Sequence, residues 1–370
     1  MQFSSETGET GSATLMVHLL GRCNLTCRHC YMEGAPTREE RLSADLVVRA
    51  ISECPRLGIG AFYLTGGEPL LYPELEEVLA AASRTRVQVT VCTNGTLLTQ
   101  RHTAWLSEAH ARVNISLDGD PAFHDSFRRS AGAFRATEKG IRTVVEAGIP
   151  LTVISSISQV NLDSLEFLAD WAARAGADQF RVQPLLKLGR GLEILDQCLT
   201  NDQMNRLLLQ LSDLANTYRP SGMRCSLVGV SRQFLLAHPC GAYVCNGAGC
   251  HRRVAKEIKK IIVREDGTVL PEVTNLDHRF ALGRIEDGTL EELVTRYFES
   301  GYDRFDYLCR KTYQEVVATW KSAVVPWDQI VAERSHLWGT RSAGRIAIPS
   351  CGTCEPPKAI EPDDSLRLSG

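Results

Sequence analysis

The sequence lacks the features that place a chain in a membrane or on a polyanion. Its apolar runs are far shorter than the ~20 residues of a membrane span. Neither sign of charge dominates, since 41 Lys and Arg stand against 44 Asp and Glu, so there is no global field for nucleic acid or anionic lipid. The first residues show no basic segment followed by a long apolar one, so no secretory signal is predicted. We therefore expect a cytoplasmic chain that binds neither nucleic acid nor membrane.

Cysteine, by contrast, is abundant. The 370 residues include 13 cysteines, which is more than a reduced cytosolic protein uses for packing alone. Without a secretory signal, disulfides are not the expected use of these thiols, and their clustering indicates metal binding. The length corresponds to two domains, or to one α/β barrel with an appendage.

The first half of the chain has the repeating pattern of a parallel sheet. Short β-branched runs alternate with amphipathic stretches, which is the βαβα order. Six strands are predicted, over residues 14–20, 61–65, 87–92, 113–118, 151–157 and 180–185. Helices are predicted over residues 43–58, 72–83, 99–109, 133–148, 162–176 and 202–218. Such units form either a partial barrel or a doubly wound sheet, and in both folds functional residues gather at the carboxyl ends of the strands.

The composition changes after about residue 218. A Gly- and Cys-rich stretch precedes a predicted hairpin over residues 258–273, with Asp266 and Gly267 as its turn. Two helices are predicted over residues 289–300 and 312–324, and the last residues are polar and rich in proline. The predicted organisation is a disordered N-terminus at 1–13, a barrel at 14–220, a cysteine-bearing domain at 221–354 and a disordered tail at 355–370.

Three cysteines lie in the loop after the first predicted strand. Cys23, Cys27 and Cys30 have the spacing C-x3-C-x2-C, and soft thiolates at this density suit an iron–sulfur cluster or zinc. A structural zinc site needs a fourth ligand, which His18 or His29 would have to supply. Three ligands on a four-iron cluster instead leave one iron open to a substrate or cofactor. The remaining cysteines of this half are predicted to be packed core thiols: Cys54, Cys92, Cys198 and Cys225.

The cysteine loop and three further motifs resemble the radical S-adenosylmethionine (SAM) superfamily. Its GGEP element is matched after the second strand by Gly66, Gly67, Glu68 and Pro69. Similar family patterns follow the third and fourth strands, where they contain Asn94, Ser116 and Asp118. The resemblance extends from residue 14 to about residue 191 and implies an α/β fold with a partial (β/α)6 TIM-like barrel.

The same resemblance implies a chemistry. A 4Fe-4S cluster held by the three cysteines binds SAM and cleaves it reductively, and the resulting 5′-deoxyadenosyl radical abstracts hydrogen from a substrate. Gly66 and Gly67 are expected to let backbone carbonyls approach the amino group of SAM, since they have no Cβ. Ser116 and Asp118 are expected to bind the ribose hydroxyls, and Arg128 to bind the carboxylate of SAM.

A second set of cysteines resembles the auxiliary-cluster domains of this superfamily, called SPASM or twitch. Its members are Cys240, Cys245, Cys250, Cys309, Cys351 and Cys354. Cys250 before the hairpin and the Cys351 and Cys354 pair fit the family layout, but Glu272 stands where the family places a cysteine. Either Glu272 binds iron through oxygen, or Cys240, Cys245 or Cys309 supplies the missing thiolate, and we prefer a cysteine. Six thiols favour one auxiliary cluster over two, with a structural zinc site as the alternative.

The combination of motifs resembles the branch that modifies ribosomally made peptides. We therefore expect hydrogen abstraction from a peptide, followed by cross-linking, epimerisation or oxidation with help from the auxiliary cluster. A flavodoxin or ferredoxin is the expected reducing partner. Residues 1–13 are too short for a leader-recognition domain, which implies a separate recognition protein or none. The alternatives are modification of a small molecule such as a tetrapyrrole or sugar, and a non-enzymatic iron–sulfur electron carrier.

Overall fold

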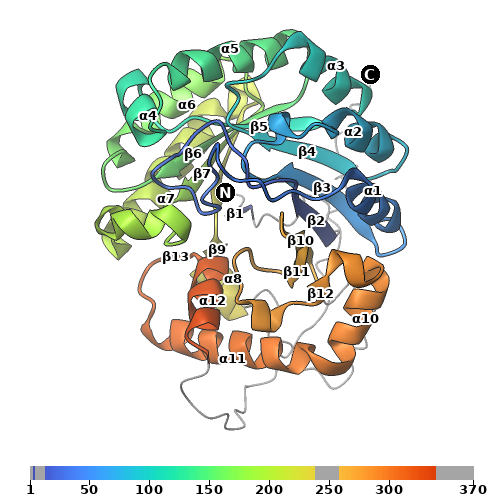
Figure 1. Cartoon of the computed structure of the whole chain (residues 1–370). Coiled ribbons are helices and arrows are strands. Elements are labelled where there is room, and N and C mark those ends of the chain that lie inside the picture. The colour runs from blue at the N-terminus through green and yellow to red at the C-terminus, as the bar shows by residue number, and fades with distance from the viewer. Residues whose placement is uncertain (1–2, 5–12, 238–257, 339–370) are drawn as a thin grey trace, which may run out of the picture.

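A computed structural model describes residues 3–4, 13–237 and 258–338. Its centre is an eleven-stranded sheet with the order β1-β8-β7-β6-β5-β4-β3-β2-β10-β11-β12. The strands from β2 to β8 run in chain order and all pair in parallel. Helices cover the outside of this curved sheet (Figure 1). The structure therefore confirms the predicted α/β class and the partial barrel.

The six predicted strands are all present. They are β2 (Ala13–His18), β3 (Ile59–Thr65), β4 (Gln88–Thr93), β5 (Arg112–Ser116), β6 (Leu151–Ile157) and β7 (Gln179–Pro184). Two further strands extend this edge of the sheet: β8 (Arg224–Val228) and β1 (Phe3–Ser4). β8 begins after residue 220, where the barrel was predicted to end, and β1 pairs with it from within the segment that was predicted to be disordered.

The predicted helices of the barrel are also present. They are α1 (Ala44–Glu53), α2 (Leu75–Ser83), α3 (Gln100–Glu108), α5 (Ala133–Glu146), α6 (Leu165–Arg174) and α7 (Asn201–Tyr218). The pattern did not predict α4 (Pro121–Phe127), which begins where Asp120 accepts a hydrogen bond from the Phe123 N–H. The 3-10 turns of this part are η1 (Pro69–Leu71), η2 (Leu162–Ser164), η3 (Gly189–Gln197) and η4 (Arg219–Ser221).

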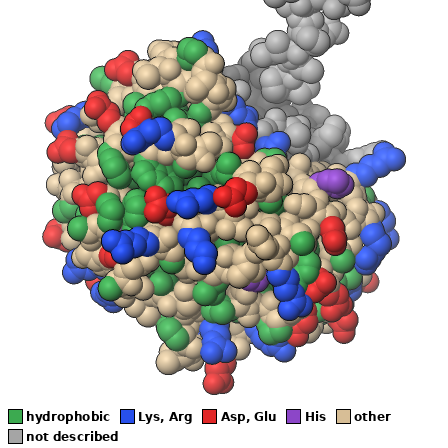
Figure 2. Space-filling model, turned by 90° about the horizontal axis from the view of Figure 1, so that it is seen from above, with side chains coloured by type: hydrophobic (Ala, Val, Ile, Leu, Met, Phe, Trp, Pro, Cys, Tyr) green, Lys and Arg blue, Asp and Glu red, His purple; other side chains and the backbone are tan. Residues whose placement is uncertain are grey.

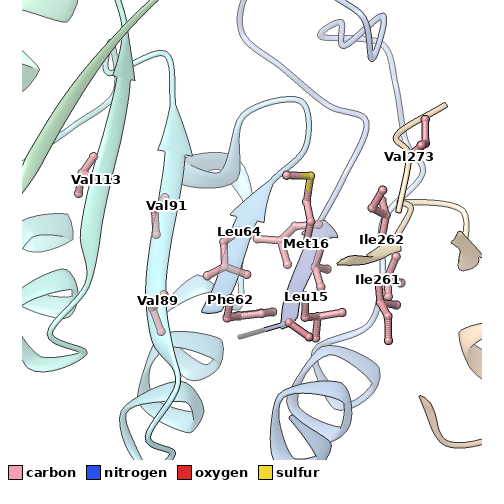
Figure 3. Close-up of a cluster of buried hydrophobic side chains, with 14 of the residues drawn as sticks. Leu15, Met16, Phe62, Leu64, Val89, Val91, Val113, Ile261, Ile262 and Val273 are labelled. Carbon is pink, nitrogen blue, oxygen red and sulfur yellow. The ribbon is translucent and has the colours of Figure 1, made fainter. Parts of the chain in front are cut away.

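The two faces of the sheet differ in chemistry. Side chains of β6 alternate between buried and partly exposed along the strand, so the two faces of this strand differ in exposure. The packed face includes Leu15, Phe62, Val89, Val91 and Val113, which lie over the helices (Figure 3). We call the opposite face the inner face. By strand register it carries Met16, Tyr63, Thr90, Asn114, Ile154, Arg181 and Ser226.

The C-terminal part continues the same sheet. The predicted hairpin consists of β10 (Lys260–Val263) and β11 (Thr268–Pro271), which pair antiparallel, and Gly267 in its turn has φ +87°. β10 also pairs in parallel with β2, so Ile261 and Ile262 lie beside Leu15 and Met16 (Figure 3). The cysteine-bearing part is thus joined to the barrel through backbone hydrogen bonds.

Helices close the C-terminal part below the sheet (Figure 1). The two predicted helices correspond to α10 (Leu290–Ser300) and α11 (Tyr302–Thr319), and α12 (Trp327–His336) follows. The small elements are α8 (Arg232–Ala237), η6 (His278–Phe280), η7 (Ile285–Asp287), β12 (Gly283–Arg284), β9 (Val230–Ser231) and β13 (Val324–Val325). β9 and β13 pair antiparallel as a separate two-stranded sheet.

The surface matches the balanced composition. Figure 2 shows acidic and basic side chains intermingled on the face seen from above, with hydrophobic side chains between them. Among the described helices, none combines the length and the apolar composition that crossing a bilayer requires.

Candidate functional site

The three cysteines of the first cluster lie together in the loop that leaves β2. Cys23 and Cys27 are buried and pack with Leu25, while Cys30 is partly exposed beside them. The loop is tied to its own chain by two backbone bonds, from Cys23 N–H to Ala35 O at 3.1 Å and from Cys30 N–H to Cys27 O at 3.4 Å. The thiols therefore lie in the loop at the carboxyl end of a strand, as predicted, and their role as metal ligands stays a prediction.

Burial disfavours the thiolate form of these cysteines unless a bound cation compensates the negative charge. Burial raises the pKa of the Cys23 thiol to about 12 and also raises the pKa of Cys27, against the opposing charge of Arg128. A bound metal reverses this preference, because its charge favours the thiolate. Three donors already point at the sulfurs: Leu25 N–H to Cys23 Sγ at 3.4 Å, Asn94 Nδ2 to Cys23 Sγ at 3.9 Å and Arg128 Nη1 to Cys27 Sγ at 4.0 Å. Such donors surround the sulfur ligands of iron–sulfur clusters.

A single zinc ion would need a fourth ligand beside these three thiols. In the part of the chain that the structure describes, no three His, Cys, Asp or Glu side chains lie close enough together to hold one metal ion. His18 and His29, the two histidines that a zinc site would need, therefore complete no such group. That these three thiols hold an iron–sulfur cluster with one unligated iron stays a prediction.

Gly66 and Gly67 support the cysteine loop from below. Gly67 N–H donates to Leu20 O at 2.6 Å, and Glu68 N–H donates to Arg22 O at 2.8 Å. A Cβ on Gly66, where φ is +141°, would lie 2.6 Å from Leu20 O, and a Cβ on Gly67 would overlap the carbonyl of Arg22. The glycines were predicted to make room for SAM. The structure gives them a different role as well, because backbone of the cysteine loop occupies the space that a Cβ would fill.

Glu68 connects the ends of β3 and β4. Its carboxylate is fully buried and accepts hydrogen bonds from Leu70 N–H at 3.1 Å, Thr93 Oγ1 at 2.6 Å and Asn94 N–H at 2.9 Å. Burial raises its pKa, although these donors oppose the shift. Pro69 opens the 3-10 turn η1 directly behind it. Glu68 and Pro69 therefore fix the loop geometry, and both carboxylate oxygens of Glu68 are already occupied by protein donors.

Asn94 joins the third strand end to the cysteine loop. Its Nδ2 donates to Asn24 Oδ1 at 2.9 Å, and its Oδ1 accepts from Thr96 N–H at 2.9 Å. Asn24 in turn donates to Thr96 Oγ1 at 2.8 Å. Ser116 ends β5 and is only partly buried on the inner face. The structure thus brings Asn94 to Cys23 and places the partly buried Ser116 at the same end of the sheet.

Asp118 and Arg128 form a buried ion pair with each other. Arg128 donates to Asp118 Oδ2 from Nε and from Nη2, each at 2.8 Å, and Ser156 N–H donates to Oδ1 at 2.9 Å. Burial alone would raise the pKa of Asp118, but the Arg128 guanidinium and the neighbouring histidines hold it at about 2. These two residues were predicted to bind the ribose and the carboxylate of SAM. In the structure their charged groups bind one another instead.

Three further residues shape the site: Arg190 and Asn161, which were not singled out from the sequence, and His29, which was named there only as a possible zinc ligand. The His29 ring stacks on Phe127, with ring centroids 4.2 Å apart, and burial lowers its pKa to about 4. Arg190 donates to Cys27 O at 2.8 Å and to Gly34 O at 3.0 Å, so it clamps the cysteine loop from η3. Asn161 donates to Asp118 O at 2.8 Å. No sequence pattern marks these residues, because each acts through a contact distant in the chain.

The structure describes only part of the predicted auxiliary site. Cys240, Cys245, Cys250, Cys351 and Cys354 lie outside the described residues. Cys309 is fully buried in α11, where burial raises its pKa well above that of a free thiol. Glu272 accepts hydrogen bonds from the backbone N–H groups of Lys259 and Lys260, so both its oxygens support the start of β10. Burial raises its pKa to about 8, and the preference for a cysteine over Glu272 as the iron ligand stays a prediction.

Comparisons with known proteins place the cysteine loop within a region that matches a known family. Residues 17–172 match the model of the Radical SAM superfamily. The chain is 30% identical over 220 residues to an AdoMet-dependent heme synthase of Nitratidesulfovibrio vulgaris, covering 57% of this chain and 59% of that protein. It is 31% identical over 178 residues to the sporulation killing factor maturation protein SkfB of Bacillus subtilis, covering 48% of this chain and 43% of SkfB. The chain therefore spans about half the length of these relatives.

Solved structures share the fold over more of the chain. SuiB of Streptococcus suis, bound to S-adenosylmethionine, superposes with a TM-score of 0.63 over 80% of this chain and 68% of SuiB, at 16% identity. The protein anSMEcpe with bound AdoMet gives a TM-score of 0.61 over 88% of this chain and 95% of that protein, at 17% identity. At these identities the likeness concerns the fold, and it includes the C-terminal part as well as the barrel.

Proposed function

Because residues 17–172 form a domain of the radical SAM superfamily, we propose that this chain is an enzyme that cleaves SAM reductively and abstracts hydrogen from a substrate. The observation that carries the proposal is the buried loop of Cys23, Cys27 and Cys30 at the carboxyl end of β2. Domains of this superfamily hold a 4Fe-4S cluster and SAM, which together supply the 5′-deoxyadenosyl radical. The three thiols fit that cluster in number, burial and surrounding hydrogen-bond donors.

The residues around the loop would hold the site in shape. Arg190 and Asn94 fix the cysteine loop from two sides, and Glu68 locks the ends of β3 and β4 beneath it. The Asp118 and Arg128 pair keeps a net neutral, water-poor wall next to Cys27. Ser116 lies partly buried at the carboxyl end of β5, a position that is compatible with its predicted contact with the ribose of SAM.

We infer that the substrate is a ribosomally made peptide. SkfB is a maturation protein, and SuiB and anSMEcpe, which share this fold, have each been solved with a bound peptide. A second candidate is modification of a tetrapyrrole, which is favoured by the identity to the heme synthase over 220 residues. In either case we propose that the C-terminal cysteines hold an auxiliary iron–sulfur cluster and that a flavodoxin or ferredoxin supplies electrons.

The first test is the cleavage of SAM. Protein reconstituted anaerobically with iron and sulfide, then reduced in the presence of SAM, should form 5′-deoxyadenosine. The Cys27→Ala variant should form none, since it removes a thiolate of the cluster. The exposed-face variant Arg135→Met serves as the matched control and should retain the activity. An electron carrier without radical chemistry would produce no 5′-deoxyadenosine from any of the three proteins.

The second test separates the two substrate classes. Peptides encoded near the gene and a tetrapyrrole such as Fe-coproporphyrin III are incubated separately with the reduced protein and SAM, and the products are analysed by mass spectrometry. A peptide product that has lost two hydrogens, or that is unchanged in mass but inverted at one residue, supports the peptide proposal. Turnover of the tetrapyrrole alone would contradict it.

A further inference from the structure

The seven parallel strands β2–β8 contain no Asp or Glu, although the chain as a whole has 44. They do contain three arginines, Arg112, Arg181 and Arg224. The strand register places all three on the inner face, since Arg112 pairs with Thr90, Arg181 with Ile154 and Arg224 with Gln179. The inner face therefore receives only positive charge from the sheet that forms it.

Arg181 differs from the other two arginines by its burial. Arg112 and Arg224 are exposed at the first positions of β5 and β8, whereas Arg181 lies in the interior of β7 and is 9% exposed. It donates from Nη2 to Gln179 Oε1 at 3.2 Å, and its buried Nε has no hydrogen-bond partner. No carboxylate in the described part of the chain lies within 4.0 Å of it.

The other two buried cationic side chains of the described residues each have an acidic partner. Arg128 is neutralised by Asp118 at 2.8 Å, and Lys260 is neutralised by Asp328 at 3.1 Å. A buried charge without a counter-charge is costly, so it is retained where a ligand supplies the partner. Arg181 is thus the one buried Lys or Arg among the described residues that lacks an acidic partner.

The position of Arg181 connects it to the cofactor end of the sheet. Ser116, Ile154, Arg181 and Ser226 are successive Cα partners across β5, β6, β7 and β8, so they form one row on the inner face. Arg181 is two strands from Ser116, which corresponds to about 9–10 Å at the usual strand spacing. Ile154 between them is only partly buried. A group bound at Arg181 would therefore lie beside the site where the radical is generated.

We propose that Arg181 binds a carboxylate of the substrate and so orients the substrate for hydrogen abstraction. A guanidinium suits this role because its N–H groups match the oxygens of a carboxylate. The proposal rests on the proposed function for its location, and it adds that the substrate is an anion. The carboxylate belongs either to an acidic side chain of a peptide or to a propionate of a tetrapyrrole.

The binding test uses probes for both sources. Glutarate represents an acidic peptide side chain and coproporphyrin III represents a tetrapyrrole, and glutaramide and coproporphyrin III tetramethyl ester are their uncharged counterparts. Binding to the reconstituted, SAM-loaded protein is measured by equilibrium dialysis without turnover. At least one carboxylate probe should bind wild type roughly tenfold or more tightly than Arg181→Met, as expected for a charge-assisted hydrogen bond. The uncharged probes should not distinguish the two proteins, and Arg135→Met, at an exposed site on α5, should bind like wild type.

The pattern of binding decides the source. A difference for glutarate assigns the site to an acidic peptide, and a difference for coproporphyrin alone assigns it to a tetrapyrrole. Equal binding of every carboxylate by wild type and Arg181→Met, or no binding by either, would overturn the proposal. Because dialysis requires no chemistry, Arg181-dependent binding together with absent 5′-deoxyadenosine would leave this site standing and reject the proposed function alone.

Stability without ligand gives an independent check. If Arg181 is held unpaired for a ligand, Arg181→Met should raise the midpoint of urea unfolding of the substrate-free protein. A lower midpoint would mean that the contact with Gln179 is structural, which would contradict the proposal. Arg181→Lys keeps the positive charge and replaces the methionine variant if that variant does not fold. It should bind the carboxylate probe more weakly than wild type does, but still more tightly than the uncharged counterpart.

Discussion

At the scale of single residues, Asp118 and Arg128 form a buried ion pair next to the cysteine loop. Asp118 is fully buried and Arg128 is 5% exposed. Removing one partner leaves the other charge unpaired in a dry environment, which typically costs about 3–5 kcal/mol. We therefore expect Asp118→Asn to lower the free energy of unfolding by about that amount, measured by urea denaturation at pH 7. The exposed pair of Asp163 and Arg206 offers a control, since Asp163→Asn should cost less than about 1 kcal/mol. Equal losses in the two variants would contradict this assignment.

The same pair makes stability depend on acid pH. The pKa of Asp118 is about 2 in the folded protein, below the ordinary value of about 3.9 that applies to the unfolded chain. Its contribution is therefore complete above about pH 4 and is lost as the pH falls through the folded pKa. The stability difference between wild type and Asp118→Asn should shrink between pH 4 and pH 2, and a difference independent of pH would reject the ion pair as its source.

The sequence predicted which residues belong to the site better than it predicted what those residues contact. The three cysteines were predicted as ligands from their spacing within eight residues, and in the structure Cys30 packs against the buried Cys23 and Cys27. Asp118 and Arg128 were predicted from the sequence to contact the cofactor, but their mutual ion pair depends on how α4 folds back over β5. Arg190 and Asn161 act through contacts that span 163 and 43 residues along the chain, and no local pattern encodes such a distance.

At the scale of elements, the central contact is the close packing of the GGEP turn under the cysteine loop. A Cβ on Gly67 would overlap the carbonyl of Arg22, and backbone on both sides leaves little freedom to move. We expect Gly67→Ala to displace the loop and to lose the iron of the first cluster, about four irons per chain, measured after anaerobic reconstitution. Gly148→Ala is the matched control: its Cβ would meet nothing within 4 Å, although φ is +66°. It should keep its iron and lose about 1–2 kcal/mol of stability. Full iron content in Gly67→Ala would contradict the packing role.

The elements of the barrel follow the sequence pattern closely, and the exceptions have physical causes. Short β-branched runs that alternate with amphipathic stretches predicted β2 to β7 within a few residues. β8 (RCSLV) escaped prediction because it contains one β-branched residue and a polar face that lies on the inner side of the sheet. α4 is only seven residues long, too short for a periodic pattern, and depends on its Asp120 cap.

At the scale of the whole molecule, the sheet joins the two functional parts. The hairpin was predicted to belong to a separate domain. Its strand β10 pairs with β2, so the hairpin continues the sheet beside the strand that leads into the cysteine loop. This parallel pairing joins residues that are 246 positions apart in the chain, such as Lys260 and Thr14. The sequence pattern does not identify these two strands as neighbours. Five cysteines lie outside the described residues, and their role as ligands of an auxiliary cluster remains a prediction.

The central claim is that the cluster of Cys23, Cys27 and Cys30 has one iron that SAM can occupy. The most direct measurement is the electron paramagnetic resonance spectrum of the reduced, reconstituted protein with and without SAM. SAM should change the spectrum of wild type, and the change should be absent in the Cys23→Ala/Cys27→Ala/Cys30→Ala variant, which keeps only the signal of an auxiliary cluster. A wild-type spectrum unaffected by SAM, or zinc in place of iron in this loop, would contradict the account.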